Sequence, residues 1–571
     1  MRTHLTRWMA VCGLVVAAAT APLAVAQSAG EIKPVAIVAF AGYDELMKDI
    51  NFIGDLGDQK GASDNIEQLV QMFTQGKGLA GFDKTKPVGV LIQTDGAMPS
   101  GALCLPVSDL NALLDVAKGF GVTTTDMGND VMQIKSAQGA SLFAKKSGAW
   151  ALLSMAPAML EGLPADPGAE FAALVNEYDI AAKVMVKNLP EAQRQQAIEA
   201  MSQGAQQGLK KEPNESDAAY AERKKMVDAQ LEQMKEFIND LDEVTVGVKV
   251  DGEQQKVFAD FAYTALPNTK LAEAIAASSD AKTNFAGFFK PEAAVNLSFA
   301  SKMTSSDSAQ LGQMVETLRT QVTEQIEKTE KIKSPESKAK AKAALEDFLA
   351  ALKATLEAGV TDGGASLELS PDSLSLIAGG FIADPAKVEA GLKKLAEVGE
   401  AEKAGDMPTI KWAADKQGDV TFHTLTRPIP EDEDEARQML GDELKMVVGV
   451  GKKAVYFALG REPMAAVKSA IDASSKSPNK AIAPFELTVG LAQILDVAKT
   501  TAPEDKKEQL EEISAMLNDS ATGRDHVRMV GQPIENGIRM RLELEEGVLR
   551  AIGMAAQQAK LQAAGAGGGG F

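Results

Sequence analysis

The sequence predicts an α+β protein that is internally duplicated, with two lobes that each hold a twisted antiparallel sheet covered by amphipathic helices and long helical hairpins. Two observations predict this class. Short alternating runs rich in β-branched residues are joined by tight turns, which is typical of antiparallel sheets. In addition, the segment SLFAKKSGAWALLSMAPAMLEGL at 141–163 returns in similar form at 446–471, as MVVGVGKKAVYFALGREPMAAVKSAI.

The two segments follow one pattern: a strand, a tight turn of lysine and glycine, a second strand, and a helix that begins at proline. Three pairs of positions match at a constant spacing of 306: Trp150 with Tyr456, Leu153 with Leu459, and Pro157 with Pro463. This spacing indicates that most of the chain is present twice. Chance is the alternative, because many α+β proteins share an order of strand, helix and hairpin.

The first half reads as two modules separated by the hairpin of 141–163, each module being a strand, two helices, a hairpin and a helix. The first module has a strand at 34–40, helices at 43–53 and 65–75, a hairpin of 88–93 with 101–107, and a helix at 110–120. The second module has a strand at 180–187, helices at 191–209 and 216–241, a hairpin of 244–250 with 256–266, and a helix at 268–278. Asp109 is placed to cap the helix that follows it.

The second half repeats this order. Its first module has a strand at 291–300, helices at 308–332 and 338–358, strands at 364–370 and 374–382, and a helix at 386–399. Its last module has a strand at 485–491, two helices broken at Ala502-Pro503, a hairpin at 526–546 turned at Asn536-Gly537, and a helix at 548–564. Asp384 stands before its helix as Asp109 does.

These patterns divide the chain into five parts. We expect a signal peptide at 1–26, an N-terminal α+β lobe at 27–280, a joint at 281–290, a C-terminal lobe at 291–562 that repeats the first, and a glycine-rich tail at 563–571 without regular structure. Glycine loses more conformational entropy on ordering than other residues, which disfavours a packed element in the tail.

The first residues predict export. Arg2 and Arg7 precede an apolar run, and Ala24-Val25-Ala26 has the small side chains of a cleavage site. Pro22 interrupts the run, which falls short of the roughly 20 apolar residues of a membrane-spanning helix. No later stretch is long and apolar enough to span a membrane. We therefore expect a protein of the bacterial periplasm or cell surface.

Charge and cysteine content narrow the possible partners. Removing 1–26 removes two arginines and no acid, so the net charge changes from -20 to -22. Such an acidic surface repels nucleic acid, and we expect no nucleic-acid partner. Cys104 is the only cysteine left after cleavage and lies in the apolar run ALCLPV. It reads as a small buried hydrophobe, in a chain with no disulfide framework.

No catalytic, cofactor-binding or metal-binding residue is predicted. His423 and His526 read as core or strand histidines, and Lys146-Ser147 reads as a hairpin turn. With one cysteine and two histidines, a Cys/His zinc site is short of ligands. The acidic run 431–435 could attract calcium, but it lacks the spacing of a calcium loop and is better explained as the start of a helix. The run VGVGKK at 448–453 lacks the spacing of a phosphate-binding loop.

The helical hairpin of the second half carries an apolar stripe. Its members recur at helical spacing and are Leu311, Met314, Leu318, Val322 and Ile326. Core packing is the simplest account of the stripe. A cavity for an apolar ligand between helices and sheet is the alternative.

Three functions are compatible with these observations. The first is an exported, non-enzymatic binding, interaction or structural protein whose partner is a protein or a hydrophobic small molecule. The second is a carrier of a lipid or another hydrophobic molecule, held between sheet and helices. The third is a hydrolase that uses carboxylates in the cleft between the lobes, which requires at least two carboxylates close together.

Overall fold

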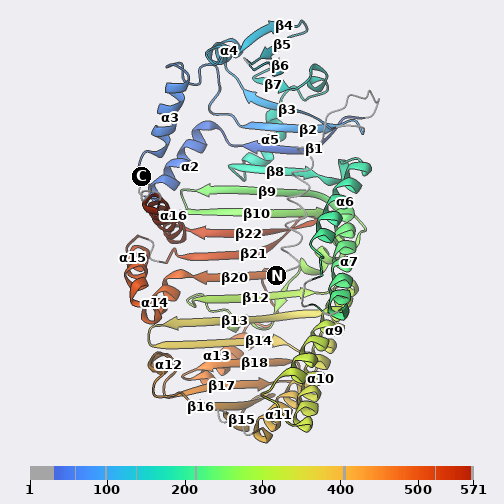
Figure 1. The fold of residues 1–571 in the computed structure, drawn as a ribbon, viewed down its shortest axis with the longest axis vertical. Coiled ribbons are helices and arrows are strands. Elements are labelled where there is room, and N and C mark those ends of the chain that lie inside the picture. Colours follow the sequence, from blue (N-terminus) through green and yellow to red (C-terminus); the bar gives the residue numbers. More distant parts are fainter. Residues whose placement is uncertain are drawn as a thin grey trace. The chain divides into compact units, whose positions relative to one another are not determined.

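The computed structural model describes residues 31–57, 59–96, 99–136, 138–211, 215, 217–402, 407–520 and 523–566 (Figure 1). The expected signal peptide at 1–26 lies outside these residues. The chain divides into two compact units, of which the first is 1–272 with 535–539 and the second is 273–534 with 540–571. Both contain helices and antiparallel strands, which confirms the predicted mixed composition and antiparallel pairing.

The strands of the first unit are paired antiparallel. They are β1 (Lys33–Phe40), β2 (Val88–Thr94), β3 (Pro99–Pro106), β4 (Thr123–Asp126), β5 (Val131–Lys135), β6 (Ser141–Ser147), β7 (Trp150–Ser154), β8 (Ile180–Met185), β9 (Leu241–Asp251) and β10 (Lys256–Ala265). Pairing gives the order β4-β5-β6-β7-β3-β2-β1-β8-β9-β10. The hairpin β6–β7 is the segment from which the fold class was predicted.

The helices of this unit come between these strands. They are α2 (Tyr43–Leu56), α3 (Ala62–Phe73), α4 (Leu110–Lys118), α5 (Pro167–Val175), α6 (Glu191–Gln207), α7 (Asp217–Asp240) and α8 (Lys270–Ser278), with 3₁₀ turns η1 (Pro157–Leu160) and η2 (Val186–Asn188). Asp109 caps α4 as predicted, because its side chain accepts hydrogen bonds from the backbone N–H groups of Asn111 and Ala112. Helix α8 spans the residue at which the two units are divided.

Glycines in the strands make room for the aromatic core of the first unit. A Cβ atom on Gly89 of β2 would lie 2.5 Å from the ring of Phe171, and one on Gly247 of β9 would lie 2.4 Å from the ring of Tyr178. Trp150 meets Phe171 edge to face, with ring centroids 5.9 Å apart. Phe171 of α5 and Tyr178, which follows the helix, can therefore lie close to the sheet because these strand positions lack a side chain.

The strands of the second unit are also paired antiparallel. They are β12 (Val295–Lys302), β13 (Val360–Ser370), β14 (Ser373–Phe381), β15 (Thr409–Gln417), β16 (Val420–Pro428), β17 (Glu443–Val450), β18 (Ala454–Gly460), β20 (Phe485–Gly490), β21 (His526–Ile534) and β22 (Gly537–Glu545). The order runs β15-β16-β17-β18-β14-β13-β12-β20-β21. The short strands β11 (Lys282–Thr283) and β19 (Lys480–Ala481) pair separately.

The helices of the second unit include its two longest elements, α9 and α10. The full set is α9 (Ser305–Lys328), α10 (Pro335–Glu357), α11 (Pro385–Ala401), α12 (Asp434–Leu440), α13 (Pro463–Ser475), α14 (Leu491–Thr501), α15 (Glu504–Ser520) and α16 (Glu546–Ala566), with the 3₁₀ turn η3 (Ala286–Phe288). Helix α9 starts with a capping box made by Thr304 and Asp307, and α10 starts at Pro335 after the N-cap Ser334. In the described part of the chain, no helix is long and apolar enough to cross a membrane.

The segment expected to be a joint, 281–290, contributes to the core of the second unit. Phe288 is fully buried, and its ring stacks on Tyr456 with centroids 5.7 Å apart and an interplanar angle of 15°. A Cβ atom on Gly379 of β14 would lie 2.9 Å from the Phe288 ring. A small residue in the sheet thus again makes room for an aromatic ring.

Several local predictions were wrong. The first copy of the repeated segment ends in a single 3₁₀ turn at Pro157, whereas Pro463 begins the α-helix α13. Asp384 precedes α11 but makes no side-chain capping bond, unlike Asp109. The hairpin β4–β5 was not predicted. Helix α16 continues to Ala566, into the segment expected to lack regular structure, and 567–571 lie outside the described residues.

Candidate functional site

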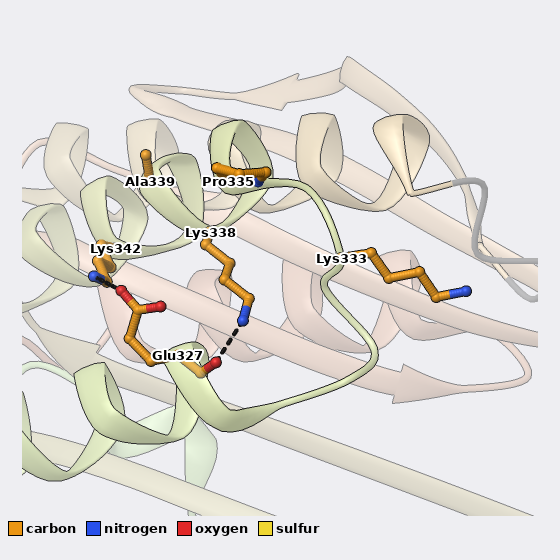
Figure 2. A pocket seen from close by; sticks show the side chains of 6 residues that line it. All are labelled: Glu327, Lys333, Pro335, Lys338, Ala339 and Lys342. Atoms are coloured by element: carbon orange, nitrogen blue, oxygen red, sulfur yellow. Dashed lines mark hydrogen bonds and ion pairs between the residues drawn. The ribbon is translucent and has the colours of Figure 1, made fainter.

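A pocket of about 360 Å³ lies where α9 ends and α10 begins. Its walls are formed by three lysines, a glutamate and two small apolar residues: Glu327, Lys333, Pro335, Lys338, Ala339 and Lys342 (Figure 2). Lys338 and Lys342 are four residues apart on α10, so both lie on the same side of the helix. The pocket is a concentration of basic groups in a chain with a net charge of -20.

The turn that shapes the pocket is fixed by hydrogen bonds. The Ser334 hydroxyl accepts a hydrogen bond of 3.0 Å from the backbone N–H of Ser337, and Pro335 needs no partner at the first helical position. Glu402, directly after α11, accepts hydrogen bonds of 3.0 Å from the backbone N–H groups of Lys333 and Ser334. The positive end of the α10 dipole therefore already has a carboxylate.

These hydrogen bonds lower the pKa of Glu402 to about 2. The largest cause is the bond from the Ser337 hydroxyl, followed by the backbone N–H groups of Lys333 and Ser334. Hydrogen bonds to the charged form favour ionisation, so Glu402 stays charged over the physiological range. The turn before α10 is therefore capped by a carboxylate that is ionised at neutral pH.

The three lysines of the pocket differ in their partners. Lys338 Nζ donates to the main-chain carbonyl of Glu327, and Lys342 pairs with the carboxylate of Glu327, which lowers the pKa of that carboxyl group (Figure 2). Lys333 projects from the turn away from Lys338 (Figure 2) and makes no side-chain hydrogen bond or ion pair within the described residues. The pocket thus has three ammonium groups and one carboxylate.

Helix α10 is anchored on the side of α11. Asp347 is nearly buried and forms ion pairs with Lys394 at 2.5 Å and with Lys387 at 3.2 Å. These contacts lower the pKa of Asp347, with the hydrogen bond from Lys394 as the largest cause. Lys338 and Lys342 therefore lie on a helix that two half-exposed lysines of α11 hold through the buried carboxylate of Asp347.

A second cluster of charged groups lies in the first unit. Asp179, before β8, is 4% exposed and receives hydrogen bonds from Lys249 Nζ at 2.5 Å and from the Val250 backbone N–H at 2.6 Å. Asp49 of α2 has a buried oxygen without a hydrogen-bond partner. Burial, with the charge of Asp179 as the next cause, raises the pKa of Asp49 to about 7. The two carboxylates belong to a contact between α2 and the sheet, and both oxygens of Asp179 are engaged.

His423 is a buried strand histidine, as expected from the sequence, and it also stabilises a bulge. Its Nδ1 accepts a 3.0 Å hydrogen bond from the backbone N–H of Ala413, where β15 departs from regular pairing and φ is 49°. Nε2 therefore carries the proton of the neutral ring and lies 3.7 Å from a carboxylate oxygen of Glu389. Burial lowers the pKa of His423, against the opposing charge of Glu389.

His526 has a different environment. Its backbone N–H donates to a carboxylate oxygen of Glu545 at 2.9 Å, and its Nδ1 lies 3.1 Å from the same oxygen. This hydrogen bond is the largest cause that raises the pKa of His526. The neighbouring Asp525 carboxylate accepts a bond from the Ala492 backbone N–H at 2.6 Å, at the start of α14. The cluster connects the ends of β20, β21 and β22.

The other residues weighed in the sequence have structural contacts. Cys104 is buried, and desolvation raises its pKa to about 12, so its thiol is protonated at neutral pH. The Ser147 hydroxyl donates to the main-chain carbonyl of Ala165. The acidic run 431–435 leads into α12, which begins at Asp434. Across the described residues, no cluster of three or more His, Cys, Asp or Glu side chains could hold a metal ion.

The apolar stripe of α9 is divided between core and solvent. Of the predicted stripe, Leu311 packs against the buried cluster of Val315, Leu349 and Leu356, in which Val315 of α9 is not a stripe residue. Met314 and Leu318 are instead 58% and 46% exposed. None of the five stripe residues is fully buried, so the predicted core packing holds only in part, at Leu311.

The sequence did not single out the lysines of the pocket. A signal was present, because the segment KIKSPESKAKAK at 331–342 is strongly basic in an acidic chain and is centred on a Ser-Pro helix start. Comparison of the chain with protein-family models, with curated proteins and with solved structures found no match.

Proposed function

We propose that the chain is an exported, non-enzymatic binding or interaction protein of the bacterial periplasm or cell surface. The pocket at the start of α10 carries this proposal. It combines charged side chains, small apolar walls and a backbone fixed by Glu402, which are properties of a site that holds a ligand. The ammonium groups of its lysines can bind a ligand by charge and hydrogen bonding.

We further propose that the two units are copies of one plan. In the first unit, the hairpins β4–β5 and β6–β7 precede β3, β2 and β1 in the strand order, and β8 and β9 follow. In the second unit, β15–β16 and β17–β18 precede β14, β13 and β12, and β20 and β21 follow. This correspondence of strand order supports a duplication.

Export is proposed from the first residues of the sequence. The arginines, the apolar run and the Ala24-Val25-Ala26 site support cleavage after Ala26. Intact-mass measurement of the protein from its own host should give a chain that begins at Gln27. A mass that includes residues 1–26 would contradict this part of the proposal.

Native mass spectrometry of the same material tests the binding role. The expected result is a mass above that of the chain alone, with a small molecule or a protein released on denaturation. A bare chain, in native spectra recorded directly from periplasmic or surface extracts, would contradict the proposed binding role. Turnover of a released compound by the purified protein would contradict the non-enzymatic assignment.

A further inference from the structure

We propose that the pocket between the end of α9 and the start of α10 binds a small, multiply charged anion, either a phosphate monoester or a di- or tricarboxylate. This inference rests on the proposed binding role and names the chemistry of the ligand. The pocket residues supply both the charge and the shape that such a ligand needs, as the following contacts show.

The charges of the pocket do not cancel. Lys338 donates to an uncharged carbonyl, so its ammonium charge is not neutralised by that bond. Lys342 is matched by the carboxylate of Glu327, and Lys333 has no side-chain partner within the described part of the chain. The lining residues carry three ammonium groups and one carboxylate, a formal excess of two positive charges, which the Glu402 carboxylate on the neighbouring turn reduces without cancelling it.

The donors available to a ligand are ammonium protons. Glu402 already occupies the free N–H groups of Lys333 and Ser334, so the backbone at the start of α10 is not free to bind a second anion. Lys338 uses one of its three donors on the Glu327 carbonyl, and Lys333 uses none on the part of the chain that the structure describes. The four-carbon stem of Lys333 lets its ammonium group turn from the direction seen in Figure 2 toward a ligand.

The size of the pocket favours an organic anion over a bare inorganic ion. A volume of about 360 Å³ lies near the lower end of the roughly 300–1,000 Å³ typical of small-molecule sites. Pro335 and Ala339 are four residues apart on one side of α10 and offer a small apolar wall. A carbon skeleton can lie on this wall while its anionic groups meet the lysines.

Isothermal titration calorimetry of the mature chain, with citrate and with glycerol phosphate as probes and acetate as the monovalent comparison, tests this inference. We expect saturable binding of at least one probe and none of acetate. Binding should weaken as salt rises, because screening reduces attraction between exposed charges. Preference for citrate or for glycerol phosphate would assign the ligand to the carboxylate or the phosphate class.

Substitutions locate the site. Lys338→Gln should weaken binding at least tenfold, and the double variant Lys333→Gln/Lys338→Gln should abolish it. Lys340→Gln is the matched control, because Lys340 lies on the same helix but pairs with Glu397 at 2.7 Å outside the pocket. Unchanged circular dichroism and unfolding midpoints would show that the variants fold.

Two results would overturn the inference. One is the absence of binding of citrate and glycerol phosphate at millimolar concentration and low salt, and the other is an equal effect of Lys338→Gln and Lys340→Gln. Release of a neutral or apolar compound, or of a protein, in native mass spectra would reject the anion while the proposed binding role stands. If native mass spectra show only the bare chain and calorimetry shows no binding, both the anion site and the proposed binding role are rejected.

Discussion

Two histidines of the second unit, the buried His423 and the half-buried His526, respond to pH in opposite directions. Burial keeps His423 neutral, and the hydrogen bond from Ala413 requires a lone pair on Nδ1. The carboxylate of Glu545 instead favours the charged form of His526. The sequence placed both histidines on strands, but it could not assign these environments, because Ala413 and Glu545 reach the rings only through strand pairing.

His423 should make the protein less stable in acid. Its folded-state pKa lies below the value of about 6.5 in an unfolded chain, so the unfolded chain binds the proton first. Its contribution to stability is therefore lost as the pH falls below about 6.5. In His423→Gln, the midpoint of urea unfolding should change less with pH below 6.5 than in the wild type. If the unfolding midpoints of the variant and the wild type changed equally with pH, His423 would not be the cause of the acid sensitivity.

His526 should act with the opposite sign. Its folded-state pKa is raised, so its contribution to stability is fully present below about pH 6.5 and is lost as the pH rises through the folded-state value. Relative to His526→Gln, the wild type should gain stability on acidification through that range. The same urea titrations measure this gain. A wild-type unfolding midpoint that falls relative to that of His526→Gln on acidification would disprove it.

A matched pair of glycine substitutions tests the core of the first unit. Gly89→Ala would place Cβ 2.5 Å from the Phe171 ring, and overpacking of this kind costs about 1–3 kcal/mol. Gly204→Ala in α6 has nothing within 4 Å of the new atom and should stabilise by about 0.5–1 kcal/mol. Chemical denaturation of both variants should give opposite shifts, and a neutral Gly89→Ala would show that α5 does not depend on this contact.

At the level of single elements, the two longest helices of the first unit were predicted closely. Helices α6 and α7 were expected at 191–209 and 216–241 and lie at Glu191–Gln207 and Asp217–Asp240. The hairpin β4–β5 was missed because β4 is the polar segment TTTD, which carries no alternating apolar pattern. The 3₁₀ turn at Pro157 has the same starting proline as α13, and the surrounding packing, not the proline, decides which helix forms.

Helix α2 should hold the sheet less tightly above neutral pH. Asp49 has a folded-state pKa of about 7, against 3.8 in an ordinary chain, because burial and Asp179 oppose its charge. As the pH rises, the unfolded chain releases this proton near pH 3.8 but the folded chain only near pH 7. The free energy of unfolding therefore falls between these two pH values. In the wild type, hydrogen exchange of α2 should show lower protection at pH 8 than at pH 6, after correction for intrinsic rates.

Asp49→Asn carries no charge at any pH and should remove this difference in α2. Asp55→Asn is the control, because Asp55 is an exposed acid on the same helix. A pH effect on α2 that persists in Asp49→Asn would show that the contact with Asp179 is not its cause.

At the scale of the whole molecule, the sequence predicted composition and pairing more fully than it predicted the site. The mixture of helices and antiparallel strands follows from periodicity and turn residues, which are local signals. The pocket depends on Glu402, which lies 68 residues beyond Ser334 in the chain and meets it only after α10 and α11 pack together. A contact of this kind leaves no pattern in a single sequence.

The bulge in β15 also affects how the protein behaves among its own copies. Among the described strands, β15 pairs only with β16, and an unpaired row of backbone groups is a template for another strand. The departure at Ala413, held by His423, breaks the regular spacing of that row. We therefore expect His423 to disfavour edge-to-edge pairing between copies, and loss of its hydrogen bond to leave a more regular edge that pairs more readily.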